Sequence, residues 1–395
     1  VIVTDHHEPG EMLPPATAIV NPKLGDYPFA DLCGAAVMFK VTQALLSRRD
    51  YGLVPGFEKW WLDMVGIATV ADMVPLRGEN RVLAQYGLQV LRKSRRPGLQ
   101  QLLKKAKANQ VTLTEEDIGF AIGPRVNAAS RMDTPEDAFH LLTSKTIAEA
   151  GERVKHLEEL NQSRKTAVSQ MTKQLHQKMQ LLEEIPAVIV MGDPTWRPSL
   201  VGLAANKLAE EYGRPAFIWG RDGNDVYKGS ARSGGATSVV MLMRAAAGAF
   251  KEYGGHHVAG GFSVTDEGIH TFGDLLNQAH ADLGEDAFVK EEIQIDALLR
   301  LEDVNQLLIN DLKVLAPFGA DNRKPLFAFK DVQPIEVEQF GKTKEHLKLT
   351  FGTESGKREA ISFFATTDSF TKTPVFLIEL ENSGIIPSKF LFDFS

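Results

Sequence analysis

The sequence predicts an α/β protein with several domains. In residues 1–145, short apolar runs alternate with segments of helical periodicity, which is the pattern of a sheet covered by helices. Residues 146–185 form one long amphipathic stretch, and from about residue 287 onward apolar and polar residues alternate as they do in β-strands. With 395 residues, the chain is long enough for two or three separate cores.

Composition and charge narrow the class of protein. The apolar fraction of 43% and charged fraction of 24% are ordinary globular values, and no run of 18 apolar residues predicts a membrane span. The first residues lack the basic start and cleavage site of a signal peptide. A single cysteine, Cys33, excludes an internal disulfide, and we therefore expect a cytoplasmic protein.

The net charge of −7 does not by itself suggest a nucleic-acid-binding protein. Charge is nevertheless one-sided between residues 92 and 107, where seven basic residues and no acidic ones occur: Arg92, Lys93, Arg95, Arg96, Lys104, Lys105 and Lys107. A solvated helical face is the favoured interpretation of this stretch, and a patch for a phosphate backbone is the alternative.

The first domain is expected to begin inside a sheet. The β-branched run 1–4 reads as the end of a buried strand, with Asp5 at its carboxyl edge. A buried strand needs neighbours on both sides, so we expect further strands upstream of Val1. Helices are predicted over residues 33–49, 60–71 and 81–92 from their apolar spacing.

The middle of the chain predicts a connector and a second α/β domain. One helix over 146–185, about 60 Å long, ends at Pro186 and bridges two domains; a helical hairpin is the alternative. A strand at 187–192, a helix at 201–212 capped by Gly213, and a strand at 216–220 form a βαβ unit. Strands at 326–329 and 346–351 predict a small β-barrel or sandwich.

Two motifs carry residues that suit metal binding. Asp5, His6 and His7 follow the first strand, and histidine and carboxylate bind Mn²⁺, Mg²⁺ or Zn²⁺ when several converge. Neighbours in a strand point to opposite faces, so the three cannot all bind one ion; a chance surface tripeptide is the alternative. Asp72 follows six mostly apolar residues and needs a cation, a metal or a helix-capping role.

Two further regions suit phosphate binding. Arg125, Asn127 and Arg131 lie among small residues in 123–132, where arginine suits bidentate phosphate contacts; structural arginine–carboxylate pairs are the alternative. Glycine-rich segments at 228–235 and 254–261 are expected to form turns whose N–H groups bind anions. Their added side-chain donors are Ser230, Arg232, Ser233 and His256.

Together these motifs resemble the DHH phosphoesterases that carry a DHHA1 domain, most closely the RecJ-type exonucleases. The resemblance spans about residues 1–370 and rests on Asp5-His6-His7, on 69–72, on 123–128, on 229–233 and on Gly254-Gly255-His256. The long helix with Asn161 and Arg164 is similar to the family's connector. The segment 315–319 and the β-rich tail are similar to the family's OB-fold.

The resemblance implies a two-metal phosphodiesterase that uses Mn²⁺ or Mg²⁺. It assigns His6 and Asp72 as metal ligands, with Asp5 as a ligand or an orienting group and His7 at the scissile phosphate. Arg125, Asn127 and Arg131 would face the substrate. The phosphates would lie against the donors from the glycine-rich segments, which are Ser230, Arg232, Ser233, Gly255 and His256.

Four domains follow from the same resemblance. They are a partial parallel-sheet DHH domain at 1–145, a connector helix at 146–185, a DHHA1 domain at 186–286 and an OB-like β-barrel at 287–395. The implied function is 5′-to-3′ exonuclease action on single-stranded DNA in repair and recombination. We expect a monomer that does not associate with a membrane. The expected partners are a single-strand-binding protein and a helicase.

Departures from the family pattern qualify these expectations. The family's first two Asp-rich motifs would stand before Asp5, so we expect a chain that lacks its N-terminus and is nearly inactive by itself. Residues 196–199 replace a Trp-His-x-Gly motif, Lys207 stands for a common arginine, and 384–395 is atypical. The alternative functions are a phosphodiesterase of cyclic dinucleotides or short oligonucleotides, and a non-catalytic nucleic-acid-binding scaffold.

Overall fold

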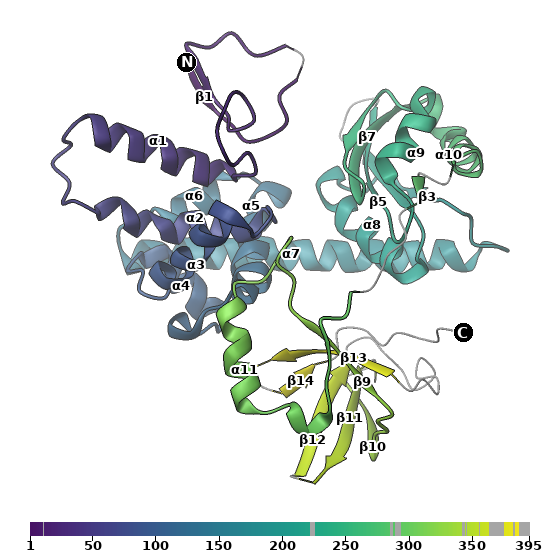
Figure 1. Cartoon of the computed structure of the whole chain (residues 1–395). Coiled ribbons are helices and arrows are strands. Elements are labelled where there is room, and N and C mark those ends of the chain that lie inside the picture. The colour runs from purple at the N-terminus through teal and green to yellow at the C-terminus, as the bar shows by residue number, and fades with distance from the viewer. Residues whose placement is uncertain are drawn as a thin grey trace. The chain divides into compact units, whose positions relative to one another are not determined.

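The chain forms two compact units in a computed structural model (Figure 1). The structure describes residues 1–10, 12–221, 226–284, 287–288, 294–341, 344, 346–354 and 356–362, together with the strand backbone at 375–381 and 384–386. One unit comprises Val1–Arg95, Lys107–Ile122 and Ile293–Ser395, and the other comprises Arg96–Ala106 and Gly123–Glu292. Each unit combines helices with a sheet, as the α/β prediction requires.

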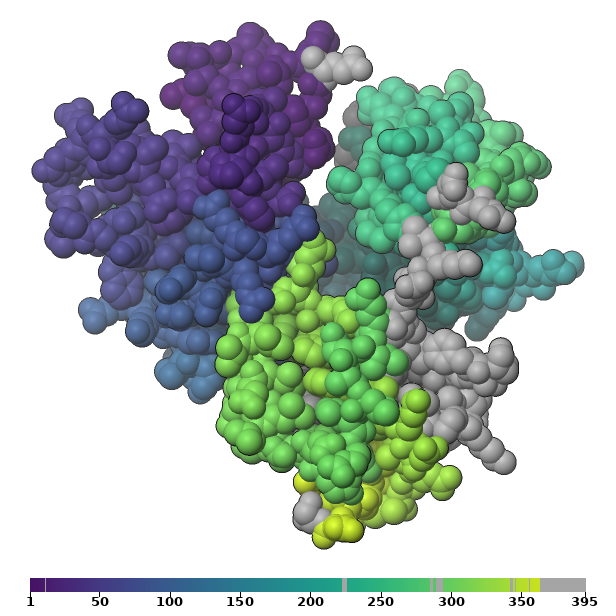
Figure 2. Space-filling view, in the orientation of Figure 1, coloured from purple at the N-terminus to yellow at the C-terminus, as the bar shows by residue number. Residues whose placement is uncertain are grey.

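The first unit opens with two short parallel strands, β1 (Ile2–Thr4) and β2 (Ala18–Val20), in which Val3 pairs with Ile19. Within the described residues β1 is an open sheet edge, since Val1 is 90% exposed and Ile2 67% exposed. In that part of the chain only β2 pairs with β1. The space-filling view accordingly shows the N-terminal residues in purple at the surface (Figure 2).

Helices of the first unit occupy the predicted places. They are α1 (Gly34–Arg48), η1 (Phe57–Trp61), α2 (Leu62–Ala71) and α3 (Gly78–Leu91), followed by η2 (Gln110–Thr112) and the π-helical turn η3 (Asp117–Ile122). Two glycines allow α2 and α3 to touch, because a Cβ atom on Gly66 would lie 2.8 Å from the Cα atom of Gly87. This close contact fixes α2, whose C-terminal end carries Asp72.

Helices of the second unit include the long connector. They are α4 (Pro97–Ala106), α5 (Gly123–Met132), α6 (Glu136–Leu142) and α7 (Ile147–Gln180). Helix α7 is continuous but ends at Gln180, five residues before the predicted end. Met179 is the last buried residue of its apolar stripe and Leu181 is 83% exposed, so packing ends the helix before Pro186 does. No described helix has both the length and the apolar character needed to span a membrane.

A five-stranded sheet forms the rest of the second unit. Its strands are β3 (Ile189–Gly192), β4 (Ala216–Arg221), β5 (Val226–Arg232), β6 (Glu252–Gly255) and β7 (Ala259–Thr265), in the order β3-β4-β5-β7-β6. Strands β3 and β4 are parallel and flank α8 (Pro198–Tyr212), which confirms the βαβ unit. Gly213 ends α8 with φ 62°, as predicted. Helices α9 (Val239–Ala245) and α10 (Phe272–Ala281) pack against the sheet, and their buried apolar residues form one hydrophobic core with those of its strands.

The glycine-rich segments correct one expectation. Residues 228–232 and 259–261 are not anion-binding turns, because they lie in β5 and β7, and β5 pairs with β4 on one side and β7 on the other. Their backbone N–H groups therefore serve the sheet. The glycines instead make room for packing, since a Cβ atom on Gly229 would lie 2.1 Å from the Phe262 ring.

The C-terminal part of the first unit is β-rich, as predicted. After β8 (Ala297–Leu298), η7 (Leu301–Asp303), α11 (Gln306–Leu312) and η8 (Lys313–Leu315) come β9 (Leu326–Lys330), β10 (Glu336–Phe340), β11 (His346–Thr353), β12 (Gly356–Ser362), β13 (Val375–Glu381) and β14 (Gly384–Ile386). The strand order is β10-β11-β12-β14-β13-β9-β8, and no described pairing joins β10 to β8. Most of the atypical stretch 384–395 lies outside the described residues.

Candidate active site

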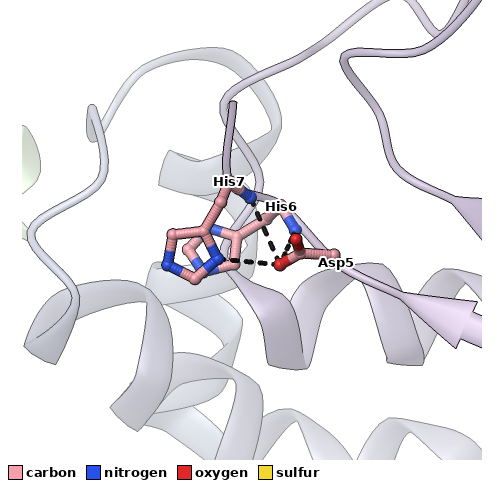
Figure 3. A group of neighbouring side chains, drawn as sticks. All are labelled: Asp5, His6 and His7. Atoms are coloured by element: carbon pink, nitrogen blue, oxygen red, sulfur yellow. Dashed lines mark hydrogen bonds and ion pairs between the residues drawn. The ribbon is translucent and has the colours of Figure 1, made fainter. Parts of the chain in front are cut away.

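The Asp5-His6-His7 motif forms a compact turn directly after β1. The backbone N–H of Asp5 donates to the Val20 carbonyl at 3.0 Å and so extends the β1–β2 pairing by one bond. Asp5 Oδ1 then accepts from the His7 ring nitrogen Nδ1 at 2.8 Å, from His6 N–H at 2.8 Å and from His7 N–H at 3.3 Å (Figure 3). These bonds, with the His7 side chain contributing most, lower the pKa of Asp5 to about 2. Asp5 is therefore ionised at neutral pH and orients His7.

Asp72 lies beside His6, although 66 residues separate them in the chain. His6 Nδ1 is 3.7 Å from Asp72 Oδ2, and the two side chains are 20% and 44% exposed. The sequence predicts that these two side chains converge, and this contact confirms it. Asp72 occupies the C-cap position of α2, where its N–H donates to the Ala68 carbonyl at 2.9 Å.

The loop that follows Asp72 is fixed by its own backbone conformation and by contacts with the segment before β9. Met73 has a positive φ of 56°, a conformation that L-residues rarely adopt and that turns the chain sharply after α2. Leu76 N–H donates to the Ala320 carbonyl at 2.6 Å, and a Cβ atom on Gly319 would lie 2.7 Å from the Leu76 side chain. The segment before β9 thus fixes the loop that carries Asp72.

Cys33 is a buried residue near Asp72. Its thiol lies 3.5 Å from Thr69 Oγ1, and Thr69 in turn donates to the Val65 carbonyl at 2.7 Å. Burial raises the pKa of the Cys33 thiol, and the nearby Asp72 charge raises it further. Cys33 therefore stays neutral and acts as a packing residue rather than as a thiolate ligand.

The donor set at this end of β1 fits a divalent cation. One ligand atom each of Asp5, His6 and His7 lies within 4.8 Å of the others, and Asp72 adds a second carboxylate beside His6. Carboxylate oxygen and imidazole nitrogen suit Mn²⁺, and carboxylate oxygen suits Mg²⁺. His6 and Asp72 are the residues that would hold such an ion, while Oδ1 of Asp5 is already engaged by His7.

A second group of candidate side chains lies in the other unit, between β5 and α8. Ser230 and Arg232 are two residues apart on β5 and therefore share one face of the sheet. That face is turned to α8, because a Cβ atom on Gly202 would lie 3.1 Å from Ser230 Oγ and 3.2 Å from Arg232 Nη2. Gly202 thus leaves room beside both donors.

Arg131 joins this group from the end of α5. Its Nη1 donates to the Ser199 carbonyl at 2.9 Å, and Ser199 Oγ donates to the Arg131 carbonyl at 2.7 Å. Arg197 adds a bond to the Met132 carbonyl at 3.1 Å. The segment 196–199, which departs from the family pattern, therefore ties the start of α8 to the end of α5.

Arg131 interacts electrostatically with two other arginines of this region, Arg164 and Arg232. Burial lowers the pKa values of Arg131, Arg164 and Arg232, and the charge of Arg131 lowers those of Arg164 and Arg232 further. In the part of the chain that the structure describes, no carboxylate forms an ion pair with any of the three. We call these three residues the arginine cluster. A group of half-buried cations, in which Arg131 repels the other two, is suited to binding an anion.

The remaining sequence candidates in this unit have other surroundings. Arg125 Nε lies 2.6 Å from Glu158 Oε2, which is the structural arginine–carboxylate pair named as the alternative interpretation. Asn127 is exposed, and the buried Ser233 donates its N–H to the Val258 carbonyl at 3.1 Å. His256 is exposed after Gly255, whose φ is 153°. The structure therefore groups Arg131, Ser230 and Arg232, and it engages Arg125 elsewhere.

Sequence reasoning assigned no substrate role to Arg164 or Asn161. Both are on α7, three residues apart, and Arg164 Nη2 donates to Asn161 Oδ1 at 3.0 Å. The available signal was an asparagine on the apolar stripe of the long helix, where a polar residue is expected to have a specific partner.

Comparisons with known proteins agree with this organisation. Residues 184–282 match the DHHA1 domain model, and residues 295–378 match the RecJ OB domain model. The chain is 34% identical over 367 residues to the single-stranded-DNA-specific exonuclease RecJ of Bacillus subtilis, covering 92% of this chain and 46% of that protein. It is 32% identical over 386 residues to the protein of the same name from Haemophilus influenzae, covering 93% and 67%.

The fold is also that of a solved structure. A crystal structure of RecJ in complex with Mn²⁺ from Thermus thermophilus matches with a TM-score of 0.82 at 27% identity, covering 100% of this chain and 58% of that chain. The chain thus spans about half of the Bacillus subtilis relative and two thirds of the Haemophilus influenzae relative.

Proposed function

Since the chain belongs to the RecJ family, we propose that it acts as a single-stranded-DNA-specific exonuclease. The proposed reaction is hydrolysis of phosphodiester bonds with two divalent ions. The observation that carries this proposal is the 3.7 Å approach of His6 to Asp72 at the carboxyl end of β1. The 5′-to-3′ direction and the role in repair and recombination rest on the family resemblance. The proposed cofactor is Mn²⁺ or Mg²⁺. Crystal structures of RecJ from Thermus thermophilus are in complex with each of these ions.

The residues at the end of β1 divide the work of the proposed reaction. When bound, the divalent ions supply Lewis acidity toward the phosphate and lower the pKa of a water molecule. His6 and Asp72 would hold such an ion in place. Asp5 accepts from Nδ1 of His7 at 2.8 Å, which directs Nε2 of that ring away from Asp5; when the ring is protonated on both nitrogens, Nε2–H would donate to the scissile phosphate.

Side chains of the second unit would bind the substrate strand. Arg131, Ser230 and Arg232 would bind phosphates of the strand, because guanidinium and hydroxyl donors read phosphate without reading the base. We propose Asn127, Ser233, Gly255 and His256 as further contacts along the strand. For Arg125 we propose a positioning role through Glu158, given their 2.6 Å ion pair.

The domain limits complete the proposal. The proposed limits are 1–145 for the DHH part, 146–185 for the connector, 186–286 for DHHA1 and 287–395 for the OB-like part. We also propose a cytoplasmic monomer that works with a single-strand-binding protein and a helicase. The buried free thiol of Cys33 supports a reducing compartment.

Two other functions compete with this proposal. A phosphodiesterase of cyclic dinucleotides or short oligonucleotides would not require the β-rich region from β8 to β14. A non-catalytic scaffold would not require Asp5, His6, His7 and Asp72 to stay grouped. The convergence of His6 with Asp72 favours an enzyme over a scaffold.

A degradation assay tests the proposal. The protein is incubated with Mn²⁺ and single strands labelled at either end, beside a duplex and a cyclic dinucleotide. We expect mononucleotide release from the 5′ end of the single strand only. Faster hydrolysis of the cyclic dinucleotide would favour the first alternative, and strand binding without hydrolysis would favour the second.

A further inference from the structure

Asn80 is completely buried near the start of α3, and its side chain makes two hydrogen bonds to other segments. Its relative exposure is 0%. Nδ2 donates to the Asp31 carbonyl at 2.6 Å and to the Pro75 carbonyl at 3.1 Å. Oδ1 meets no donor in the part of the chain that the structure describes. A flipped amide would place Oδ1 against these two carbonyls, so the two donor bonds fix the orientation of the amide. A buried amide used in this way has a specific role.

The two carbonyls belong to the segments that support the candidate metal ligands. Pro75 lies three residues after Asp72, in the loop between α2 and α3. Asp31 lies three residues before Gly34, the first residue of α1. A Cβ atom on Gly34 would lie 3.5 Å from Cδ2 of His6. One buried side chain therefore joins the backbone next to one candidate ligand to the backbone next to the other.

The loop between α2 and α3 needs support from outside itself. Met73 has a φ of 56°, which is unfavourable for an L-residue and persists where surrounding contacts hold it. Pro75 has no N–H, so its carbonyl is the hydrogen-bonding group of its backbone, and Asn80 donates to it. The next residue, Leu76, donates its N–H to the Ala320 carbonyl at 2.6 Å. Loss of the Asn80 bonds would therefore let the loop shift without releasing it.

We propose that Asn80 is a positioning residue of the candidate metal site. Its two donor bonds set the separation of His6 from Asp72, which is 3.7 Å between Nδ1 and Oδ2. Without these bonds both ligands remain, but the distance between them varies more widely. A divalent ion binds most tightly to ligands that are already in place, because binding then does not have to order them. This inference rests on the proposed function for the assignment of His6 and Asp72 as metal ligands.

Asn80→Leu tests this role, because leucine has a similar shape but no hydrogen-bond donor. Mn²⁺ binding to the protein is measured without substrate, from the electron paramagnetic resonance signal of the free ion. We expect Asn80→Leu to weaken Mn²⁺ binding about tenfold, the lower end of the range for residues that orient a metal ligand. Asn80→Ser keeps one hydroxyl donor and should weaken binding by a smaller factor. If both variants bind Mn²⁺ like the wild type while His6→Ala does not, the inference is wrong and the proposed function stands.

Leu91→Ala is the matched control for stability. Leu91 is completely buried at the other end of α3, and its truncation should lower the melting temperature at least as much as Asn80→Leu does. The Mn²⁺ affinity of Leu91→Ala should stay within about twofold of the wild type, because the two sites are far apart on the helix. An equal loss of Mn²⁺ affinity in Leu91→Ala and Asn80→Leu would show that Asn80 acts through general stability, which would overturn the inference.

Hydrolysis provides a second readout. The rate of Asn80→Leu should fall at limiting Mn²⁺ and return nearly to the wild-type rate at saturating Mn²⁺, because the ligands themselves are retained. A rate that stays equally low across the Mn²⁺ titration would contradict a role through metal affinity. If no hydrolysis occurs in any of these proteins but Mn²⁺ binding depends on Asn80, the proposed function fails and the inference holds.

Discussion

The end of β1 and the arginine cluster of the second unit differ in how their charges are satisfied. At the end of β1, Asp5 is engaged by His7 and Asp72 lies beside His6, so the ionisable groups are paired and partly exposed. In the arginine cluster, Arg131 repels both Arg164 and Arg232, and none of the three has a described carboxylate partner. The first arrangement is suited to a cation and the second to an anion. Metal binding and phosphate binding should therefore fail separately when each region is changed.

The largest expected effect concerns the metal-type residues. His6→Ala and Asp72→Asn should each lower the hydrolysis rate more than about 100-fold. Mutation of a residue that only orients a metal ligand already lowers activity about 10- to 100-fold. Asp5→Asn, which weakens the bond that orients His7, should fall in that smaller range. Strand binding in EDTA should stay within about twofold for all three variants.

Glu159→Gln is the control for these variants, since it removes an exposed carboxylate from the other unit. Rates are measured on a labelled single strand across a Mn²⁺ titration. Full activity of Asp72→Asn at any Mn²⁺ concentration would remove Asp72 from the metal site.

The second effect concerns salt dependence. Arg232→Gln should weaken metal-free strand binding about tenfold and lower the salt slope by about 0.7. The double change Lys104→Ala and Lys105→Ala on α4 should leave that slope unchanged, because we interpret this exposed basic face as solvated. Binding is followed by anisotropy at several salt concentrations. A lower slope in the lysine variant would instead place α4 on the strand.

A smaller effect is expected from two glycines. Gly202→Ala adds a methyl group 3.1 Å from Ser230 Oγ and 3.2 Å from Arg232 Nη2, so strand affinity should fall about two- to tenfold while the metal-type site is unaffected. Gly151→Ala on α7 meets no atom within 4 Å and should stabilise the protein by about 1 kcal/mol. Thermal denaturation and strand binding of both variants check this pair, and equal affinity losses would contradict it.

The smallest expected effect is a pH dependence of stability. Burial, and then Arg214, lower the pKa of His280 on α10 below 6.5, so the unfolded chain binds this proton more readily than the folded chain. The contribution of neutral His280 is complete above about pH 6.5 and is lost as the pH falls through the lower folded pKa. Asp5 behaves differently in the first unit, since its pKa of about 2 keeps it charged throughout this window.

His280→Gln removes the titrating group and provides the comparison for that pH effect. Melting temperatures are measured at pH 7.5 and 5.5, and the wild-type protein should lose more stability between them than the variant does. An equal loss in the two proteins would show that His280 does not contribute.

Local patterns were sufficient for much of the fold and for half of the site. The βαβ unit, the Gly213 cap and the long helix follow from periodicity and turn chemistry within a few residues. The roles of the glycines in 228–232 did not, because a glycine-rich run suits both a turn and a strand packed tightly against a ring such as Phe262. The end of α7 was also missed, since it depends on where packing stops at Met179.

The sequence by itself identified the candidate metal-binding and phosphate-binding residues: Asp5, His6, Asp72 and the serine and arginine of β5. Tertiary structure alone decided how they are grouped. Arg125 and Arg131 are six residues apart with the same side chain, yet one pairs with Glu158 and the other joins Arg164 and Arg232. The packing of α5 on α7 and of α8 on β5 makes that distinction. Contacts between distant segments depend on helix orientation and packing, which no local pattern specifies.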